Sequence, residues 1–518
     1  MDTLLIIIVL LPLAVAVLLL AMPAAASRVY RLVAGLTTAV TLVLTGVLFA
    51  AFDRSAAGFQ FVFAQPWLPR LNLSFSLGLD GISMAAFLLT GLVAFAGVAL
   101  ARDVRERQKE HYILYLTLVG GAYGAFASLD LFFFYFFSEF EVLCAYLLIA
   151  GWGRLPAADG TRGESRAAMT MTLFTGAGAI LVLLGLLGLW CVGGGTLDLP
   201  DLLARLDSRP IAPAVQQGLF VLFAVGFGTL MSMWPLHAWS PPAYAAAPTA
   251  VSMFAGGVLK QLGAYGLLRI AVPLLPEAAR WAAPALAAIG TVNVLYGAWL
   301  AMRQRDWKRM IAYASISHIG YVLIGLAALN MVGLGGVAML IFAGGLSTAL
   351  LFALAGRIEE YTGDRDIARF GGLARQAPFL GVCLVMAAMA AVGLPGFAGF
   401  VGEVMVFAGC WMEGSLPVRA AVVAGVWGLV LSAVYLLWAV RFGVFGPVPA
   451  GAPKIRDPKH PAGRVPFLLL LAALLAVGVW PRLLTGPIRH SLEPAPPPAA
   501  APAAPAPAVP PPPPTGTP

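Results

Sequence analysis

The chain has 518 residues, of which 60% are hydrophobic and only 11% are charged, and its mean hydropathy is +0.88. This composition excludes a soluble globular protein and indicates a chain that crosses a membrane many times. The net charge of +8 then belongs to loops at the membrane surface, so nucleic acid is not an expected partner. The four cysteines form no CxxC pair and no cluster with histidine, which argues against disulfides and a metal site.

Apolar segments long enough to cross a bilayer as helices follow one another along the whole chain and predict fourteen membrane spans. The first lacks a basic leader, so we expect it to be retained rather than cleaved as a signal peptide. The expected spans cover about residues 3–22, 30–52, 82–101, 111–128, 131–152, 168–192, the two halves of 219–270, 281–302, 310–328, 332–356, 378–411, 418–442 and 466–484.

Three features lie outside these spans. Residues 53–80 alternate apolar and polar side chains, as in FQFVF and LNLSFSL, and predict a surface hairpin. Residues 494–518 consist largely of proline and alanine and predict an extended, disordered tail. When each loop is numbered by the span that precedes it, most of the 32 Lys and Arg residues fall in the odd-numbered loops. This bias predicts that the odd-numbered loops face the cytoplasm and that both termini lie outside.

Proline interrupts two of the expected spans at related places. The seventh span ends in Trp-Pro-Leu-His around Pro235, and the twelfth contains Leu-Pro-Gly around Pro395. Because the two breaks lie five spans apart, they indicate two five-helix units of opposite orientation, as in transporters with inverted repeats. We therefore predict an all-α, polytopic membrane fold with broken helices. Its expected parts are residues 1–110, a first repeat at 111–270, a second repeat at 271–442, a last span at 443–493 and the tail.

Few ionisable residues lie within the expected spans. A lysine in the middle of a span costs about 2.5–3.5 kcal/mol on insertion scales, so Lys260 is expected to be paired, hydrated or functional. Glu403 also lies deep in a span near a proline break. Lysine can lose its proton when desolvated, which makes proton transfer the favoured role for both residues.

The remaining candidates allow two interpretations each. Glu139 and Glu141 are two residues apart on one helix and point to nearly opposite sides, so we expect one to face the bundle and the other a neighbouring subunit. His318, among polar residues in IAYASISHIGY, could relay protons or simply pack in the core. His237, beside the seventh-span proline, could be an accessory group or cap the broken helix.

The sequence contains no GxGxxG after a strand, no phosphate-binding loop, no metal-binding cluster and no serine-nucleophile elbow. Any redox or energy source is therefore expected on a partner. Five segments match those of a known protein family, and the resemblance covers nearly the whole chain up to the tail. The segments are DLFFFYFFSEFEVLCAYLLIAGWG, MWPLHAW, APTAVSMFAGGVLKQLGAYGLLR, DWKRMIAYASISHIGYVLIGL and GLPGFAGFVGEVMVF.

The chain resembles the antiporter-like membrane subunits of NADH:quinone oxidoreductase (complex I), and its length is closest to that of subunit M, also called chain 4. The resemblance implies fourteen helices in two inverted repeats and a multi-pass subunit of a bacterial cytoplasmic membrane. It also implies NADH, FMN, iron–sulfur clusters and quinone on partner subunits of the membrane and peripheral arms, with none on this chain. Proton movement would then be coupled to quinone reduction elsewhere in the complex.

By their positions in the matching segments, the resemblance assigns four residues to a polar axis across the membrane. Glu139 matches the fifth-span glutamate that couples to the adjacent subunit, Lys260 the central lysine of the eighth span, His318 the tenth-span histidine and Glu403 the residue that ends the proton path.

The chain also departs from the family pattern. Met231 stands where the family usually has a lysine, six residues before the histidine of Pro-Leu-His. Gly344 stands where the family often has histidine, and Pro-Ala-Tyr at 242–244 replaces the usual Asp-Ala-His. These changes predict impaired pumping without changing the fold.

Two other functions stay open on the sequence alone. One is a subunit of a multi-subunit cation/proton antiporter or, in a variant of the same idea, of a membrane-bound hydrogenase, formate lyase or carbon-uptake complex. The other is a scaffold subunit that has lost its pump, which Met231 and Gly344 favour.

Overall fold

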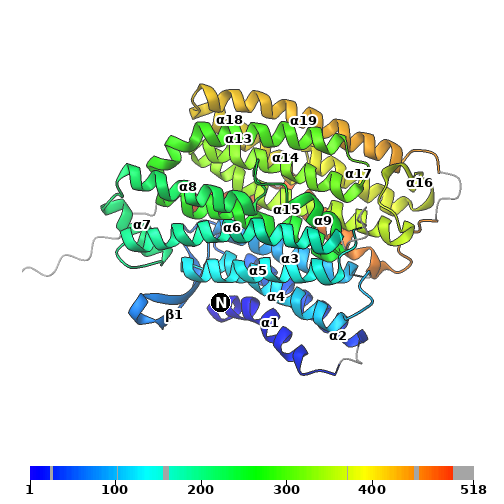
Figure 1. Ribbon diagram of the computed structural model, residues 1–518, viewed down its shortest axis with the longest axis horizontal. Coiled ribbons are helices and arrows are strands. Elements are labelled where there is room, and N and C mark those ends of the chain that lie inside the picture. Colours follow the sequence, from blue (N-terminus) through cyan, green and yellow to red (C-terminus); the bar gives the residue numbers. More distant parts are fainter. Residues whose placement is uncertain (24–26, 102, 156–162, 370, 449–453, 494–518) are drawn as a thin grey trace, which may run out of the picture.

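The computed structural model describes residues 1–23, 27–101, 103–155, 163–369, 371–448 and 454–493. Nearly all regular structure in these ranges is helical, and the long helices lie side by side along the longest dimension of the molecule (Figure 1). The expected tail at 494–518 lies outside the described residues.

The first half of the chain forms α1 (Asp2–Leu20), α2 (Ser27–Ala51), β1 (Gln60–Leu68), β2 (Leu73–Leu79), α3 (Gly81–Leu100), α4 (Gln108–Ala127), α5 (Leu131–Trp152), α6 (Gly163–Val192), α7 (Leu199–Ser208), α8 (Pro213–Leu230), α9 (Ser240–Ala246), α10 (Thr249–Phe254), η2 (Ala255–Leu259), α11 (Lys260–Gly266), η3 (Leu267–Ala271) and α12 (Val272–Leu274). Here η2 and η3 are single π-helical turns, so the eighth span is one helix whose hydrogen bonding changes twice.

The second half forms α13 (Pro276–Met302), α14 (Trp307–Ala327), α15 (Met331–Thr362), α16 (Leu373–Gln376), α17 (Pro378–Val392), α18 (Ala398–Glu413), α19 (Leu416–Gly443), α20 (Val465–Val479) and α21 (Arg482–Leu492). Short 3₁₀ turns lie at Pro69–Leu71, Ile367–Arg369 and Pro461–Gly463.

Ten helices among the described residues are long and apolar enough to cross a membrane, or eleven if the bent pair α20 and α21 counts as one span. The other expected spans are a less apolar helix, α4, and the two segments that are interrupted at a break, from α9 to α12 and from α17 to α18. This arrangement is consistent with the fourteen predicted spans. The spans beyond the ten long apolar helices are those whose helices contain a break or more polar groups.

The predicted hairpin is confirmed as an antiparallel pair of strands, β1 and β2, with irregular register near each end. It lies with α7 at one end of the bundle, whereas α16 lies at the opposite end (Figure 1). The all-α fold prediction is confirmed as well, and the predicted hairpin lies outside the long helices. α7 was not anticipated; it is too short to cross a membrane.

The prediction for the last span was wrong in its second half. Instead of one helix through residue 484, α20 ends at Val479 and the chain bends by 68° before α21. Pro481 ends the first helix because it offers no backbone N–H, and α21 then packs against α3 and α15. A Cβ on Gly81, at the start of α3, would lie 2.2 Å from the carbonyl oxygen of Pro487, so only glycine permits this contact.

Candidate proton-transfer site

One small cavity brings together groups from both halves of the chain. It is enclosed by the eighth-span helix, α14, α15, α17 and α18, and has a volume of about 20 Å³, enough for about one water molecule. Its polar lining residues are Lys260, Gln261, Ser315, His318, Tyr321, Ser347, Thr348 and Glu403. Three of the four residues assigned by resemblance to the polar axis, namely Lys260, His318 and Glu403, therefore share one cavity.

Lys260 begins α11 directly after the π-helical turn η2, and its side chain is 1% exposed. Its Nζ donates a hydrogen bond to Ser315 Oγ of α14 at 2.9 Å, and Ser315 Oγ donates in turn to the carbonyl oxygen of Ala312 at 2.7 Å. No carboxylate lies within ion-pair distance of Lys260 among the described residues. The partner of the Lys260 ammonium group is therefore a neutral hydroxyl group and not a carboxylate.

Glu403 enters the cavity from α18, after the predicted break in the twelfth span. The break is confirmed: α17 ends at Val392, Gly393 has φ +79°, and α18 starts at Ala398. A Cβ on Gly393 would lie 1.9 Å from Glu403 Oε2, so the glycine both permits the left-handed backbone and leaves room for the carboxyl group. Oε2 is buried and has no hydrogen-bond partner among the described residues.

The two histidines are placed differently. His318, on α14 three residues after Ser315, lines the cavity and lies 6.3 Å from the ring of Tyr321. His237 lies in the break before α9 and does not line the cavity. Its ring packs edge-on against Tyr296 at 5.2 Å, and its Nδ1 is buried without a hydrogen-bond partner in the described part of the chain.

The carboxylates of the fifth span face opposite ways, as their spacing predicted. Glu141 is fully buried against α4, where its Cγ would lie 3.2 Å from a Cβ on Gly121, and neither of its oxygens has a hydrogen-bond partner among the described residues. Glu139 is half-buried and lies on the side of α5 that also exposes Phe136 and Leu143. Neither glutamate lines the cavity that contains Lys260.

The two departures from the family pattern have clear structural settings. Met231 directly follows α8 as its C-cap residue and is fully buried, and its Cβ would lie 2.9 Å from a Cβ on Gly263 in α11. The side chain that would be a lysine in the family pattern is therefore part of the apolar contact between the seventh and eighth spans. Gly344 lines the cavity beside Lys260, and a Cβ placed on it would meet no atom within 4 Å. The cavity thus has free space at the position where the family often has a histidine.

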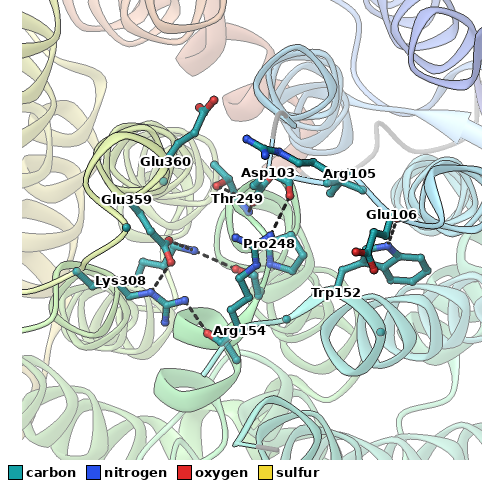
Figure 2. A pocket seen from close by; sticks show the side chains of 18 of the residues that line it. Asp103, Arg105, Glu106, Trp152, Arg154, Pro248, Thr249, Lys308, Glu359 and Glu360 are labelled. Carbon is teal, nitrogen blue, oxygen red and sulfur yellow. Dashed lines mark hydrogen bonds and ion pairs between the residues drawn. The ribbon is translucent and has the colours of Figure 1, made fainter. Parts of the chain in front are cut away.

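A second, larger cavity of about 490 Å³ opens at the end of the bundle formed by the loops after α3, α5 and α15 (Figure 2). Lys308 at the start of α14 is 2% exposed, and its Nζ lies 2.8 Å from Glu359 Oε2 and donates to the Ala247 carbonyl at 3.0 Å. Arg365 donates to Glu359 Oε1 at 2.6 Å and to the Ala245 carbonyl at 2.7 Å.

These cations bind the carbonyl groups at the end of α9, where the helix stops and the groups have no partner within the helix. Sequence reasoning missed this cluster, although Lys308 belongs to the quoted DWKRMIAYASISHIGY segment. The available signal was a lysine next to the predicted start of a span.

The fold and the cavity define a class of protein: a multi-pass membrane protein with two broken helices whose buried lysine and glutamate share a polar cavity. Residues 128–432 match the family described as NADH:quinone oxidoreductase/Mrp antiporter, TM. The NADH-quinone oxidoreductase subunit M of Rhodobacter capsulatus is 34% identical over 506 residues, which cover 95% of this chain and 96% of that protein.

Solved structures agree with this match. A chain of respiratory complex I from Thermus thermophilus superposes with a TM-score of 0.82 at 31% identity, covering 94% of this chain and 98% of that one. A chain of the Mrp complex from Dietzia sp. DQ12-45-1b has a TM-score of 0.79 at 22% identity over 94% and 96% of the two chains, which shows a shared fold. The chain belongs to the antiporter-like membrane-subunit family of NADH:quinone oxidoreductase, in its subunit M or chain 4 branch.

Proposed function

We propose that this chain is a membrane-arm subunit of a proton-translocating NADH:quinone oxidoreductase, and that protons move through it over Lys260, His318 and Glu403. The observation that carries the proposal is that these three groups, from three separate helices, line one buried cavity. Ionisable groups within a membrane are costly and mark ion or proton paths when they face an interior cavity. The cavity has room for a water molecule that can link groups that do not touch.

The redox chemistry belongs to partners in this proposal. NADH, FMN, the iron–sulfur clusters and the quinone would be bound by other subunits, and the energy of quinone reduction would reach this chain through its neighbours. Glu139 is suited to that contact, because a half-buried carboxylate on an apolar outer surface is stabilised by a cation on an adjacent subunit. Glu141 and His237 remain possible accessory groups, since both are buried with unpaired polar atoms among the described residues.

The orientation follows from the loop charges. The larger cavity lies among the odd-numbered loops, which are the basic ones, so we place it on the cytoplasmic side and both termini on the outer side of the bacterial membrane. In that orientation, the cavity lets water approach the start of the helix that carries Lys260 from the cytoplasm.

The test uses the assembled complex in sealed vesicles, with proton translocation and quinone reduction measured together. Lys260→Ala and Glu403→Gln should lower the number of protons moved per electron, while quinone reduction and the amount of complex stay near the parent values. Lys260→Arg should also fail, because arginine does not release its proton. Asp130→Asn provides the matched comparison, as a buried carboxylate outside the cavity.

A non-pumping scaffold is the second candidate, and the apolar contact of Met231 is the observation that favours it. If the Lys260 and Glu403 variants translocate protons at the parent ratio, the scaffold function is the correct one. Co-purification separates the remaining alternative: a cation/proton antiporter complex would contain no iron–sulfur subunits.

A further inference from the structure

The helix that carries Lys260 is held at both of its ends by carboxylates that flank a single neighbouring helix, α3. Asp80 is the N-cap residue of α3, and Asp103 follows its C-terminal end by three residues. α3 packs along α10 and η2, so its two ends lie near the two ends of the eighth span. Neither Asp80 nor Asp103 lines the cavity that contains Lys260.

At the end near the larger cavity, Asp103 Oδ2 accepts hydrogen bonds from the backbone N–H of Thr249 at 2.9 Å and from Thr249 Oγ1 at 3.1 Å. Thr249 is the first residue of α10, so its N–H is one of the groups that the helix itself leaves unpaired. Figure 2 shows Asp103 directed toward Thr249. The carboxylate thereby caps the helix from a loop that is remote in sequence.

At the opposite end, Arg269 Nη1 lies 2.9 Å from Asp80 Oδ2. The two side chains are only 12% and 2% exposed, and the guanidinium group also lies over the ring of Phe59 at 4.5 Å. The other oxygen of Asp80 accepts from the Ser83 N–H at 2.9 Å, which fixes the carboxylate to the first turn of α3. Separating a buried pair of this kind is strongly unfavourable, because it leaves a buried charge without a partner.

Between these two attachments, the helix departs from α-helical hydrogen bonding. The π-helical turn η2, with the sequence AGGVL, ends immediately before Lys260. A π-helical turn accommodates one residue more than an α-helical turn, and such turns often occur at functional sites. The two adjacent glycines in η2 add backbone freedom, because glycine has no Cβ to restrict its dihedral angles.

We propose that Asp80 and Asp103 are positioning residues that fix both ends of the Lys260 helix, so that η2 and the lysine are the part that moves when a proton passes. The proposal rests on the proposed function, because it assumes that Lys260 gains and loses a proton. A change of charge on Lys260 alters the force on its helix. With both ends fixed, the helix cannot slide as a unit, so the displacement is taken up in η2.

The first experiment compares Asp103→Ala with Asp103→Asn in the assembled complex in vesicles. The alanine variant removes the acceptor for Thr249 and should lose this subunit's share of proton translocation. The number of protons moved per electron should fall to the value of Lys260→Ala, while quinone reduction continues. The asparagine variant keeps an oxygen acceptor and should retain the parent ratio. Asp80→Ala should behave as Asp103→Ala does. Asp201→Ala is the control, since that carboxylate forms an exposed pair with Arg205 on α7.

A purely structural role would lower the amount of complex, quinone reduction and proton translocation in parallel, and the asparagine variant would then offer no selective rescue of the ratio. That result, or an Asp103→Ala variant that translocates protons at the parent ratio, would overturn the proposal. If Lys260→Ala also translocates at the parent ratio, the proposed function fails as well. If only Lys260→Ala loses protons, the positioning role alone is wrong.

A second measurement needs no variant and covers the case in which Asp103→Ala does not assemble. Hydrogen–deuterium exchange of the parent complex is compared at rest and during turnover. Exchange should rise in Ala255–Leu259 and stay constant in Thr249–Phe254. An equal rise in both segments would show that the whole helix moves and would refute fixed ends.

Discussion

Replacement of Lys308 by alanine tests how strongly the break between α9 and α10, just before the Lys260 helix, is held. Lys308 Nζ lies 2.8 Å from Glu359 Oε2 and donates to the Ala247 carbonyl at 3.0 Å. Alanine removes both interactions in one step. Glu359 keeps its second cation, because Arg365 Nε lies 2.6 Å from Glu359 Oε1. The Ala247 carbonyl loses its charged donor but stays within hydrogen-bond distance of Ser252 Oγ, at 3.1 Å.

The expected cost follows from what remains paired. Breaking a buried ion pair typically costs about 3–5 kcal/mol when the remaining charge has no other partner. Here Glu359 keeps Arg365 and is 21% exposed, so its share of the cost is small. The lost hydrogen bond has a charged donor, and such bonds contribute about 1.5–3 kcal/mol. We therefore expect Lys308→Ala to destabilise the chain by about 2–3 kcal/mol.

Thermal unfolding in detergent can measure this effect with a thiol-reactive dye in a Cys191→Ser background, because Cys191 is exposed whereas Cys144, Cys383 and Cys410 are buried in the native chain. Arg205→Ala is the matched control. It breaks an ion pair of 2.9 Å whose side chains are 46% and 38% exposed, and exposed pairs contribute about 0–1 kcal/mol.

A double-mutant cycle of Lys308→Ala with Glu359→Gln then isolates the pair itself, and we expect a coupling of about 1 kcal/mol or more between the two positions. If Lys308→Ala unfolds at the same temperature as Arg205→Ala, the lysine does not hold the break, and the reasoning from burial and hydrogen bonding is refuted.

Three further predictions concern other parts of the chain. Met231→Lys should raise the number of protons moved per electron, because it restores a cation to the seventh span; a parent complex that already pumps at the full ratio of intact relatives would contradict this. Hydrogen bonds from the backbone N–H groups of Asp366 and Arg365 and the contact with Arg369 hold the pKa of Asp364 below its usual value of 3.8. Asp364 therefore stabilises the fold above that value and loses the contribution as the pH falls below it, so Asp364→Asn should flatten the acid limb of a stability-against-pH curve. A cysteine at position 369, whose native side chain is 72% exposed, should react with an impermeant thiol reagent only from the cytoplasmic side, and labelling from outside would reverse the topology.

The sequence by itself determined the class of the protein and most of its helices. Apolar length and hydropathy do not depend on tertiary contacts, so the spans, the hairpin and the two proline breaks could be predicted from local pattern alone. The opposite directions of Glu139 and Glu141 also followed from helical periodicity, because two residues on a helix turn a side chain to nearly the opposite face. The bend after Val479 was missed, since one proline in an apolar run is compatible with either a kink or an end.

Only the tertiary structure decided which of the ionisable groups meet. Lys260, His318 and Glu403 are far apart in the sequence, and they share a cavity because the three helices that carry them pack together with α15 and α17; no local pattern contains that information. The same holds for Asp80 and Asp103, which are unremarkable loop carboxylates in the sequence and become attachments for the Lys260 helix once α3 packs beside it. Local chemistry specifies each helix, whereas the partners of a buried charge are set by packing between helices, where an unpaired polar group is most costly.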